Sequence, residues 1–225
     1  MAELRGDEAR HLARVLRAEP GQLYEVSDNQ AAYLAEIAEA RPDLVVFRIR
    51  EAVDSPVPPV PIDLCAALFK FDRFEWMIEK ATELGVERIL PVEAVRSEKG
   101  LLEASRNRTP RWTRIVRESS QQSRRVRVPE ILPAVRFDRC LRQEADYRYL
   151  LDEHAAPPLL RLLPPDRPAP GHVALLTGPE GGWTDTERQL AAAAGWEAAS
   201  LSPLILRTET AAAAAIAVLV NAWMA

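Results

Sequence analysis

The segment Thr177-Gly-Pro-Glu-Gly-Gly-Trp183, here called the glycine loop, lies between two elements that the sequence marks clearly. The apolar run before it, residues 172–176, predicts a buried strand. After it comes Thr184, with Glu187 three residues further on, which is the spacing of a capping box at a helix start. A strand, a glycine turn and a helix N-terminus together can hold a ligand, because glycine lets the backbone approach closely.

A second deciding segment is Leu201-Ser-Pro-Leu-Ile-Leu-Arg-Thr-Glu-Thr210, which leads into residues 211–224. These residues are apolar on every side of a helix, so we expect that helix to be packed inside protein. A phosphate loop is disfavoured, because the glycine loop has neither a Gly-Lys-Ser/Thr ending nor a GxGxxG pattern. A merely structural turn and an ordinary buried helix remain the alternatives for the two segments.

Prolines divide the chain into two predicted domains. The run Asp54-Ser-Pro-Val-Pro-Pro-Val-Pro61 predicts a stiff connector. Before it, short alternating segments separated by turn residues predict a small β-rich domain, residues 1–55. After it, strands alternate with helices over residues 60–225, which implies a parallel sheet covered on both faces. The expected elements are strands 62–68, 88–92 and 147–152, a helix from Asp72 to Gly85, and a proline-rich loop through Pro170.

Composition limits the function classes. The longest apolar stretch, residues 211–220, is shorter than the roughly 20 residues that span a bilayer, and the N-terminus lacks the apolar core of a signal peptide. We therefore expect a cytoplasmic protein with no membrane contact. Cys65 and Cys140 have no CxxC spacing, so we expect buried thiols and no metal site. His11, His154 and His172 are scattered and complete no catalytic triad.

Positive charge is concentrated between residues 106 and 127, although the net charge of the chain is -4. This stretch carries eight arginines against a single acid, Glu118. Arg111, Arg114 and Arg117 recur every three residues with apolar residues between them, which predicts a helix with one basic and one apolar face. Such a face suits the phosphates of RNA, and an arginine face that contacts only solvent is the alternative.

The two C-terminal segments closely resemble the signature of the RsmE family, the uridine-N3 methyltransferases of 16S (small-subunit) ribosomal RNA in the SPOUT superfamily. The resemblance extends to residues 11–17 with Pro20-Gly21, to Lys80-Ala-Thr-Glu-Leu-Gly-Val86, to Arg96-Ser97 and to residues 118–129. Members of that family usually begin further upstream, with the first strand of a barrel. This chain begins almost at the predicted first helix, which leaves open how the barrel closes.

The resemblance implies an α/β fold, a SPOUT trefoil-knotted parallel-sheet methyltransferase domain preceded by a small PUA-like β-barrel that binds RNA. Residues 204–210 would thread through a preceding loop, a rare exception among protein folds. The family pairs its last helices across a homodimer, uses S-adenosylmethionine as cofactor and acts on 16S rRNA of the 30S subunit. Two alternatives remain, a non-catalytic RNA-binding ribosome-assembly factor and a SPOUT methyltransferase acting on another RNA position.

The resemblance also implies roles for single residues. Uracil N3 carries a proton, so the site should remove it or stabilise the resulting anion. Arg207 could stabilise the anion, and Glu209 or Glu180 could orient or accept the proton, although an acid such as Glu209 also suits a first helical turn without any function. The cofactor is expected to contact Leu176, Thr177, Gly178, Glu180, Gly181, Gly182, Leu201, Ser202, Leu206 and Thr210. RNA is expected to contact Arg14, Arg17, Arg96, Arg111, Arg114, Arg117 and Arg125.

Overall fold

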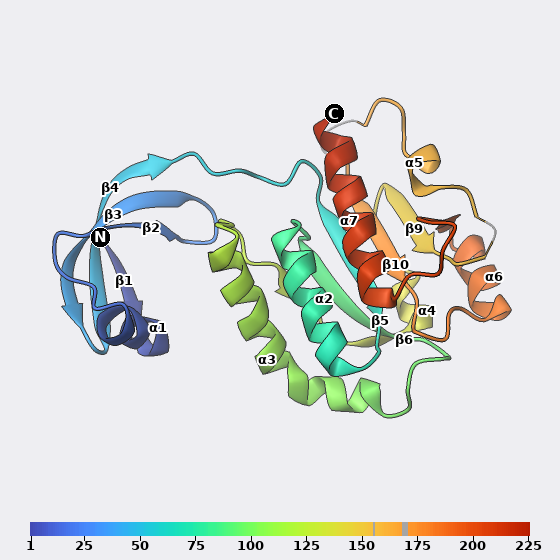
Figure 1. Ribbon diagram of the computed structural model, residues 1–225, viewed down its shortest axis with the longest axis horizontal. Coiled ribbons are helices and arrows are strands. Elements are labelled where there is room, and N and C mark those ends of the chain that lie inside the picture. Colours follow the sequence, from blue (N-terminus) through green and yellow to red (C-terminus); the bar gives the residue numbers. More distant parts are fainter. Residues whose placement is uncertain (155, 168–170) are drawn as a thin grey trace. The chain divides into compact units, whose positions relative to one another are not determined.

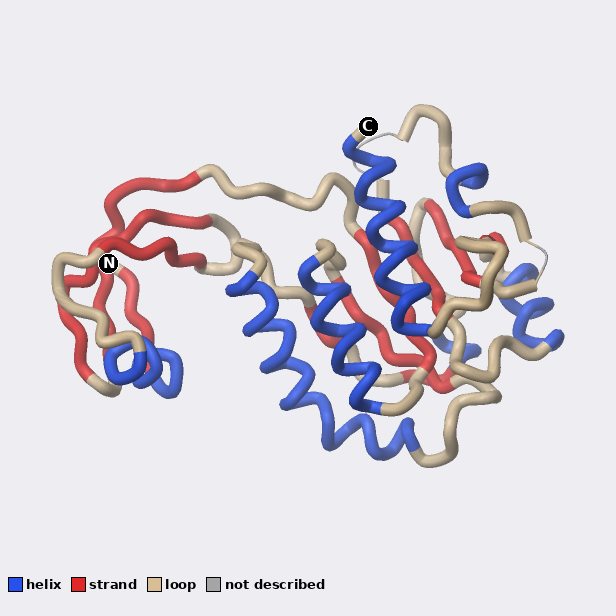
Figure 2. Tube along the Cα trace, in the orientation of Figure 1, coloured by secondary structure: helices blue, strands red, loops and turns tan. Residues whose placement is uncertain are grey.

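The computed structural model describes residues 1–154, 156–167 and 171–225, and the chain divides into two compact units (Figure 1 and Figure 2). Unit 1 consists of Met1–Val57 and Arg124–Arg127, and unit 2 of Pro58–Ser123 and Val128–Ala225. Pro170, in the expected proline-rich loop, lies outside the described residues. No helix in the described ranges has both the length and the apolar character needed to cross a membrane.

Unit 1 is built on a curled antiparallel sheet with the strand order β1-β4-β3-β2. Its strands are β1 (Ala2–Arg5), β2 (Leu23–Ser27), β3 (Ala32–Arg41) and β4 (Leu44–Val53). Two register shifts between β3 and β4 bend these strands, as bulges do. The short helix α1 (Gly6–Arg10) and the π-helical turn η1 (His11–Val15) bury Ala9 and Leu12 against the sheet. The residues before α1 thus form a first strand, β1, which pairs with β4.

Unit 2 is built on a parallel sheet with the order β11-β9-β10-β5-β6-β7, and β8 also pairs with β6. Its strands are β5 (Ile62–Ala67), β6 (Arg88–Glu93), β7 (Glu130–Ile131), β8 (Val135–Arg136), β9 (Tyr147–Leu151), β10 (Val173–Thr177) and β11 (Glu197–Ala199). The paired strands of this sheet run parallel throughout the described residues, so their carboxyl ends meet at one edge. This is the edge where open α/β sheets bind ligands.

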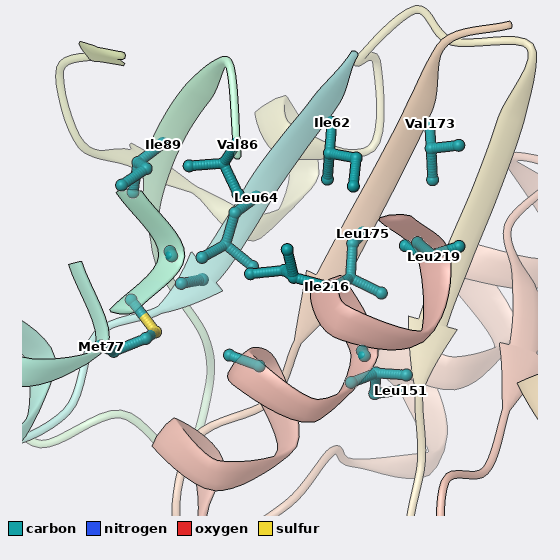
Figure 3. Packing of buried hydrophobic residues seen from close by; sticks show 14 of the residues in the cluster. Ile62, Leu64, Met77, Val86, Ile89, Leu151, Val173, Leu175, Ile216 and Leu219 are labelled. Carbon is teal, nitrogen blue, oxygen red and sulfur yellow. The ribbon is translucent and has the colours of Figure 1, made fainter. Parts of the chain in front are cut away.

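Helices cover both faces of the sheet, as the sequence predicts. One face packs against α2 (Phe71–Glu83), α3 (Leu101–Gln122), α5 (Leu159–Leu162) and α7 (Thr208–Met224), the other against α4 (Phe137–Cys140) and α6 (Asp185–Ala193). Figure 3 shows Leu64 and Leu175 of the sheet beneath Ile216 of α7. Cys65 lies on the opposite face, in the second cluster, as strand alternation requires. The threading of residues 204–210 through a knot stays a prediction.

The last helix corrects one expectation. Although α7 is apolar on every side, the chain buries only one stripe of it, which includes Ala212, Ile216 and Leu219. Ala217 is exposed and Val218 is only partly covered, because α7 lies over the outer surface of the sheet and has no neighbour on its far side among the described residues. An apolar composition on all sides therefore does not mean that this chain alone encloses the helix.

Candidate active site

A cleft lies at the carboxyl ends of β9, β10 and β11, beside the first turn of α7. Its walls are formed by residues 151–153, by the glycine loop except for Glu180 and Gly181, by most of residues 199–206, and by Thr208 and Ala211 of α7. The cleft is open to solvent, and the empty space in it and at its mouth together amounts to about 610 Å³. The described parts of the chain contain no group of His, Cys, Asp or Glu side chains that could hold a metal ion.

A larger residue would be crowded or strained at each glycine of the glycine loop. A Cβ on Gly178 would lie 3.1 Å from the ring of Trp183, and one on Gly181 would lie 3.3 Å from the Cβ of Arg96. Gly182 has a φ of +66°, in the left-handed region that favours glycine. The glycines thus close a tight turn, and that turn forms one wall of the cleft.

Trp183 connects the glycine loop to the end of β9. Its indole is buried, with 1% exposed, and its ring centre lies 5.3 Å from that of Phe137. The indole Nε1 donates a hydrogen bond of 2.9 Å to the carbonyl oxygen of Leu151. Leu151 and Trp183 both line the cleft, so this contact fixes the distance between two of its walls.

Two further side chains connect the loop after β6 to the glycine loop and α6. Arg96 donates hydrogen bonds to the carbonyl oxygens of Gly181 at 2.7 Å and Trp183 at 3.3 Å. Glu187 accepts from the backbone N–H of Val95 at 2.9 Å and completes the predicted capping box with Thr184. Part of the Arg96 guanidinium is thus committed to the protein, and its contact with RNA stays a prediction.

Asp152 and Glu153 follow β9 and are the two carboxylates among the described residues that line the cleft. Asp152 accepts hydrogen bonds from Arg188 at 2.7 and 3.2 Å and from the N–H of His154 at 3.1 Å. Burial raises the pKa of Asp152, but the hydrogen bonds and charge of Arg188 outweigh this effect, so the pKa is lowered overall. Asp152 is therefore a charged but neutralised group, whereas Glu153 is exposed.

Six of the ten residues predicted to contact a cofactor line this cleft. They are Thr177, Gly178, Gly182, Leu201, Ser202 and Leu206. The other four do not line it, for separate physical reasons. Leu176 points into the core on the opposite face of the sheet, Gly181 faces Arg96, Glu180 forms an ion pair with Arg73 at 3.3 Å, and Thr210 is exposed on α7.

Sequence reasoning missed the contribution of residues 151–153 to the cleft. No motif marks these residues, and their position depends on the pairing of β9 with β10, which are adjacent in the sheet but separated in the chain. The usable signal was the end of the predicted strand 147–152, because parallel strands bring their carboxyl ends together.

Two of the three predicted catalytic groups, Arg207 and Glu209, lie at the first turn of α7, whereas Glu180 lies in the glycine loop. Arg207 is exposed between Leu206 and Thr208, which both line the cleft, and it has no ion-pair partner among the described residues. Glu209 is 8% exposed, and its Oε2 has no hydrogen-bond partner in the described part of the chain. Thr177, at the cleft wall, has a buried hydroxyl that likewise lacks a partner there. Buried polar atoms without partners are costly and mark places where a ligand or partner can bind.

Helix α3 carries Arg111, Arg114 and Arg117 and is here called the arginine helix. It is less basic than its own sequence suggests. Arg111 donates to Glu75 of α2 at 2.7 Å, and Arg114 forms an ion pair with Glu118 at 3.5 Å. Counting acids within residues 106–127 overlooks Glu75, which the fold brings to the helix from outside that stretch. The other predicted RNA contacts are Arg14 and Arg17, exposed in unit 1, and Arg117 and Arg125, which each have a partner within the protein.

Family models identify both parts of the chain. A model described as an RNA methyltransferase domain matches residues 56–220, and one described as an RNA methyltransferase PUA domain matches residues 4–50. The chain therefore belongs to the RNA methyltransferase family with an N-terminal PUA domain, which confirms the predicted fold class and the resemblance to RsmE proteins.

Single relatives agree with this assignment. The Ribosomal RNA small subunit methyltransferase E of Synechocystis sp. is 33% identical, over 92% of this chain and 68% of the relative. The crystal structure of the protein of that name from Neisseria gonorrhoeae, bound to S-adenosyl methionine, has 30% identity and a TM-score of 0.90, covering 99% of this chain and 92% of that one. A methyltransferase from Legionella pneumophila, also in complex with S-adenosylmethionine, has 30% identity and a TM-score of 0.87, covering 98% and 91%.

Proposed function

We propose that this protein transfers the methyl group of S-adenosylmethionine to N3 of a uridine in 16S rRNA of the small ribosomal subunit. It is an enzyme of the RNA methyltransferase family, and its relatives are named small-subunit ribosomal RNA methyltransferases. The observation that carries the proposal is the cleft at the strand ends, formed by the two segments that the sequence singles out. Acting on ribosomal RNA, the enzyme would work in the cytoplasm.

The cleft suits the cofactor in polarity. Leu201, Leu204 and Leu206 supply an apolar wall for the adenine, and the buried Thr177 hydroxyl supplies a polar atom that needs a partner. When bound, S-adenosylmethionine supplies a methyl group on a sulfonium, which is an excellent leaving group. The protein therefore has mainly to position the two reactants.

The acceptor needs more help than the donor. Loss of the N3 proton leaves an anion spread over O2 and O4 of uracil, and Arg207 provides a positive charge beside the cleft for that anion. We propose that Glu209, whose Oε2 has no hydrogen-bond partner among the described residues, accepts the N3 proton, in preference to Glu180. Glu180 pairs with Arg73 and lies outside the cleft lining.

Methylation of 30S subunits from a strain lacking this gene tests the proposal. Purified enzyme and radiolabelled S-adenosylmethionine should label 16S rRNA, and reverse transcription should stop at one uridine, because N3 methylation blocks its pairing edge. Label at another position would favour the alternative of a SPOUT methyltransferase that acts on another RNA position. Donor binding without any label would favour the non-catalytic assembly factor.

We further propose a homodimer formed through the uncovered side of α7. Ala217, Val218 and Asn221 line a groove there together with Leu160 of α5. A two-fold dimer pairs the same surface of both subunits. Replacing Val218 by aspartate should convert a dimer into a monomer in analytical ultracentrifugation, because a carboxylate would lose its water on entering the interface.

Leu190 of α6 provides the control for the dimer test. It is also a large apolar side chain, 49% exposed, but it lies on the other face of the sheet. Leu190→Asp should leave the sedimentation coefficient unchanged. If the wild-type protein sediments as a monomer, the interface is rejected.

Contact of the arginine helix with RNA predicts a change in salt dependence. Replacing Arg114 by alanine should weaken binding to 30S particles and reduce the slope of log K against log salt by about 0.7–0.9, the value for one phosphate contact. The affinity for S-adenosylmethionine should not change, because Arg114 is outside the cleft lining. Arg114 is a better choice for this test than Arg111, because removing Arg111 would also take away the close ion-pair partner of Glu75.

The matched control is Arg139→Ala on α4, which removes one exposed arginine outside the predicted RNA contacts. An identical slope for wild type and Arg114→Ala would mean that the arginine helix contacts only solvent. The RNA surface would then have to be sought in unit 1.

A further inference from the structure

We propose that Glu153 binds the ribose of S-adenosylmethionine, with its carboxylate accepting hydrogen bonds from both ribose hydroxyls. This inference rests on the proposed function and adds a specificity-determining residue to the site. It concerns a side chain outside both C-terminal segments, in a stretch of sequence without a motif.

The position of Glu153 is set by β9 and by the glycine loop. Glu153 follows β9 by two residues and lines the cleft. Its Oε1 lies 2.7 Å from the position that a Cβ on Gly182 would occupy. The carboxylate thus lies directly against the backbone of the glycine loop, in space that a side chain at residue 182 would share.

Glu153 is also the cleft carboxylate whose oxygen atoms remain available. Asp152 beside it is 5% exposed and uses both of its oxygens for Arg188 and His154. Glu153 is exposed and has no ion-pair partner among the described residues. Arg96 reaches the same wall, 4.0 Å from the Gly182 Cβ position, but donates to the carbonyl oxygens of the glycine loop.

Two positively charged groups of S-adenosylmethionine could attract a carboxylate, the sulfonium and the α-amino group, and both are disfavoured. Contact with the sulfonium would stabilise a charge that disappears during methyl transfer, so it would slow the reaction. The α-amino group and a carboxylate are bonded to the same carbon of the methionine part, so Glu153 near the amino group would repel that carboxylate. No basic side chain of the described residues lines the cleft to offset this repulsion.

The ribose has neither drawback. It is neutral and presents two neighbouring hydroxyl donors, which match the two oxygens of one carboxylate, as in the acidic residue that binds the ribose of dinucleotides. The unpartnered Thr177 hydroxyl in the same cleft is an independent sign that a polar ligand binds there.

The test is calorimetric titration of the full-length protein with three ligands that share the adenosine part. S-adenosylmethionine has all groups, S-adenosylhomocysteine lacks the sulfonium, and 5′-methylthioadenosine lacks both the sulfonium and the amino acid. Glu153→Ala should weaken binding of all three by a similar factor of about ten or more, as expected for hydrogen bonds to a charged acceptor. Glu153→Gln, which keeps one acceptor oxygen, should lose less.

Glu144→Gln, at an exposed glutamate before β9, is the control and should bind all three ligands like the wild type. Since Glu153 is exposed, its variants should unfold at the wild-type temperature. A loss confined to S-adenosylmethionine would overturn the proposal in favour of the sulfonium, and a loss that spares 5′-methylthioadenosine would overturn it in favour of the amino group. Unchanged affinity in Glu153→Ala would overturn it while leaving the proposed function intact, whereas a wild type that binds none of the ligands would overturn both.

Discussion

Replacing Arg207 by alanine is expected to lower kcat by about 10²- to 10³-fold, the usual effect of losing one group that stabilises a developing anion. Arg207 is exposed next to the cleft, and the described residues give it no ion-pair partner, so its charge is available to the acceptor base. The Kd for S-adenosylmethionine should stay the same, because Arg207 is outside the cleft lining. An equal fall in kcat and kcat/KM would indicate an interaction made only in the transition state.

Single-turnover methylation of 30S particles, together with calorimetric titration of the donor, separates these effects. Arg207→Lys retains the charge but not the planar guanidinium, so it should recover part of the rate. A rise in KM for RNA with an unchanged kcat would contradict the catalytic role and make Arg207 a simple RNA contact.

Replacing Trp183 by alanine is expected to reduce the free energy of unfolding by about 3–5 kcal/mol, the usual cost of removing a large buried aromatic ring. Trp183 is 1% exposed, packs against Phe137 and Gly178, and donates a hydrogen bond to Leu151. The substitution leaves a cavity and an unpaired carbonyl oxygen, and it detaches the glycine loop from β9. Donor affinity should therefore fall as well.

Urea denaturation of the purified variants measures this cost. Trp76→Ala is the matched control, because Trp76 on α2 is 45% exposed and much of its surface already contacts water. Its loss of stability should be clearly smaller. If both variants lose the same free energy of unfolding, the buried ring of Trp183 contributes no more stability than an exposed one, and its role in fixing the glycine loop is rejected.

Features that depend on local sequence could be predicted well. The capping box of Thr184 and Glu187 forms as its spacing indicates, with hydrogen bonds in both directions. The run 62–68 predicts a buried strand and β5 is buried at each of its six residues, because helices cover both faces of the sheet. In these cases the local sequence pattern was enough to predict the element.

Side-chain direction and distant contacts were harder to predict. Thr177 lines the cleft, and strand alternation turns the side chain of Leu176 into the core on the other face of the sheet. Glu153 and the pairing of Arg111 with Glu75 depend on elements far apart in the chain, which no local pattern records. The assignments of Arg207 and Glu209 as catalytic residues stay predictions.

The glycine loop is held from three directions, by Trp183 to β9, by Arg96 to the loop after β6, and by the capping box to α6. A loop fixed in this way has lost most of its conformational freedom before any ligand arrives. Binding then costs little ordering entropy, so modest contacts with backbone groups are enough for useful affinity. Selection can act on side chains around the rim, such as Glu153, while the shape of the loop itself is already set by the fold.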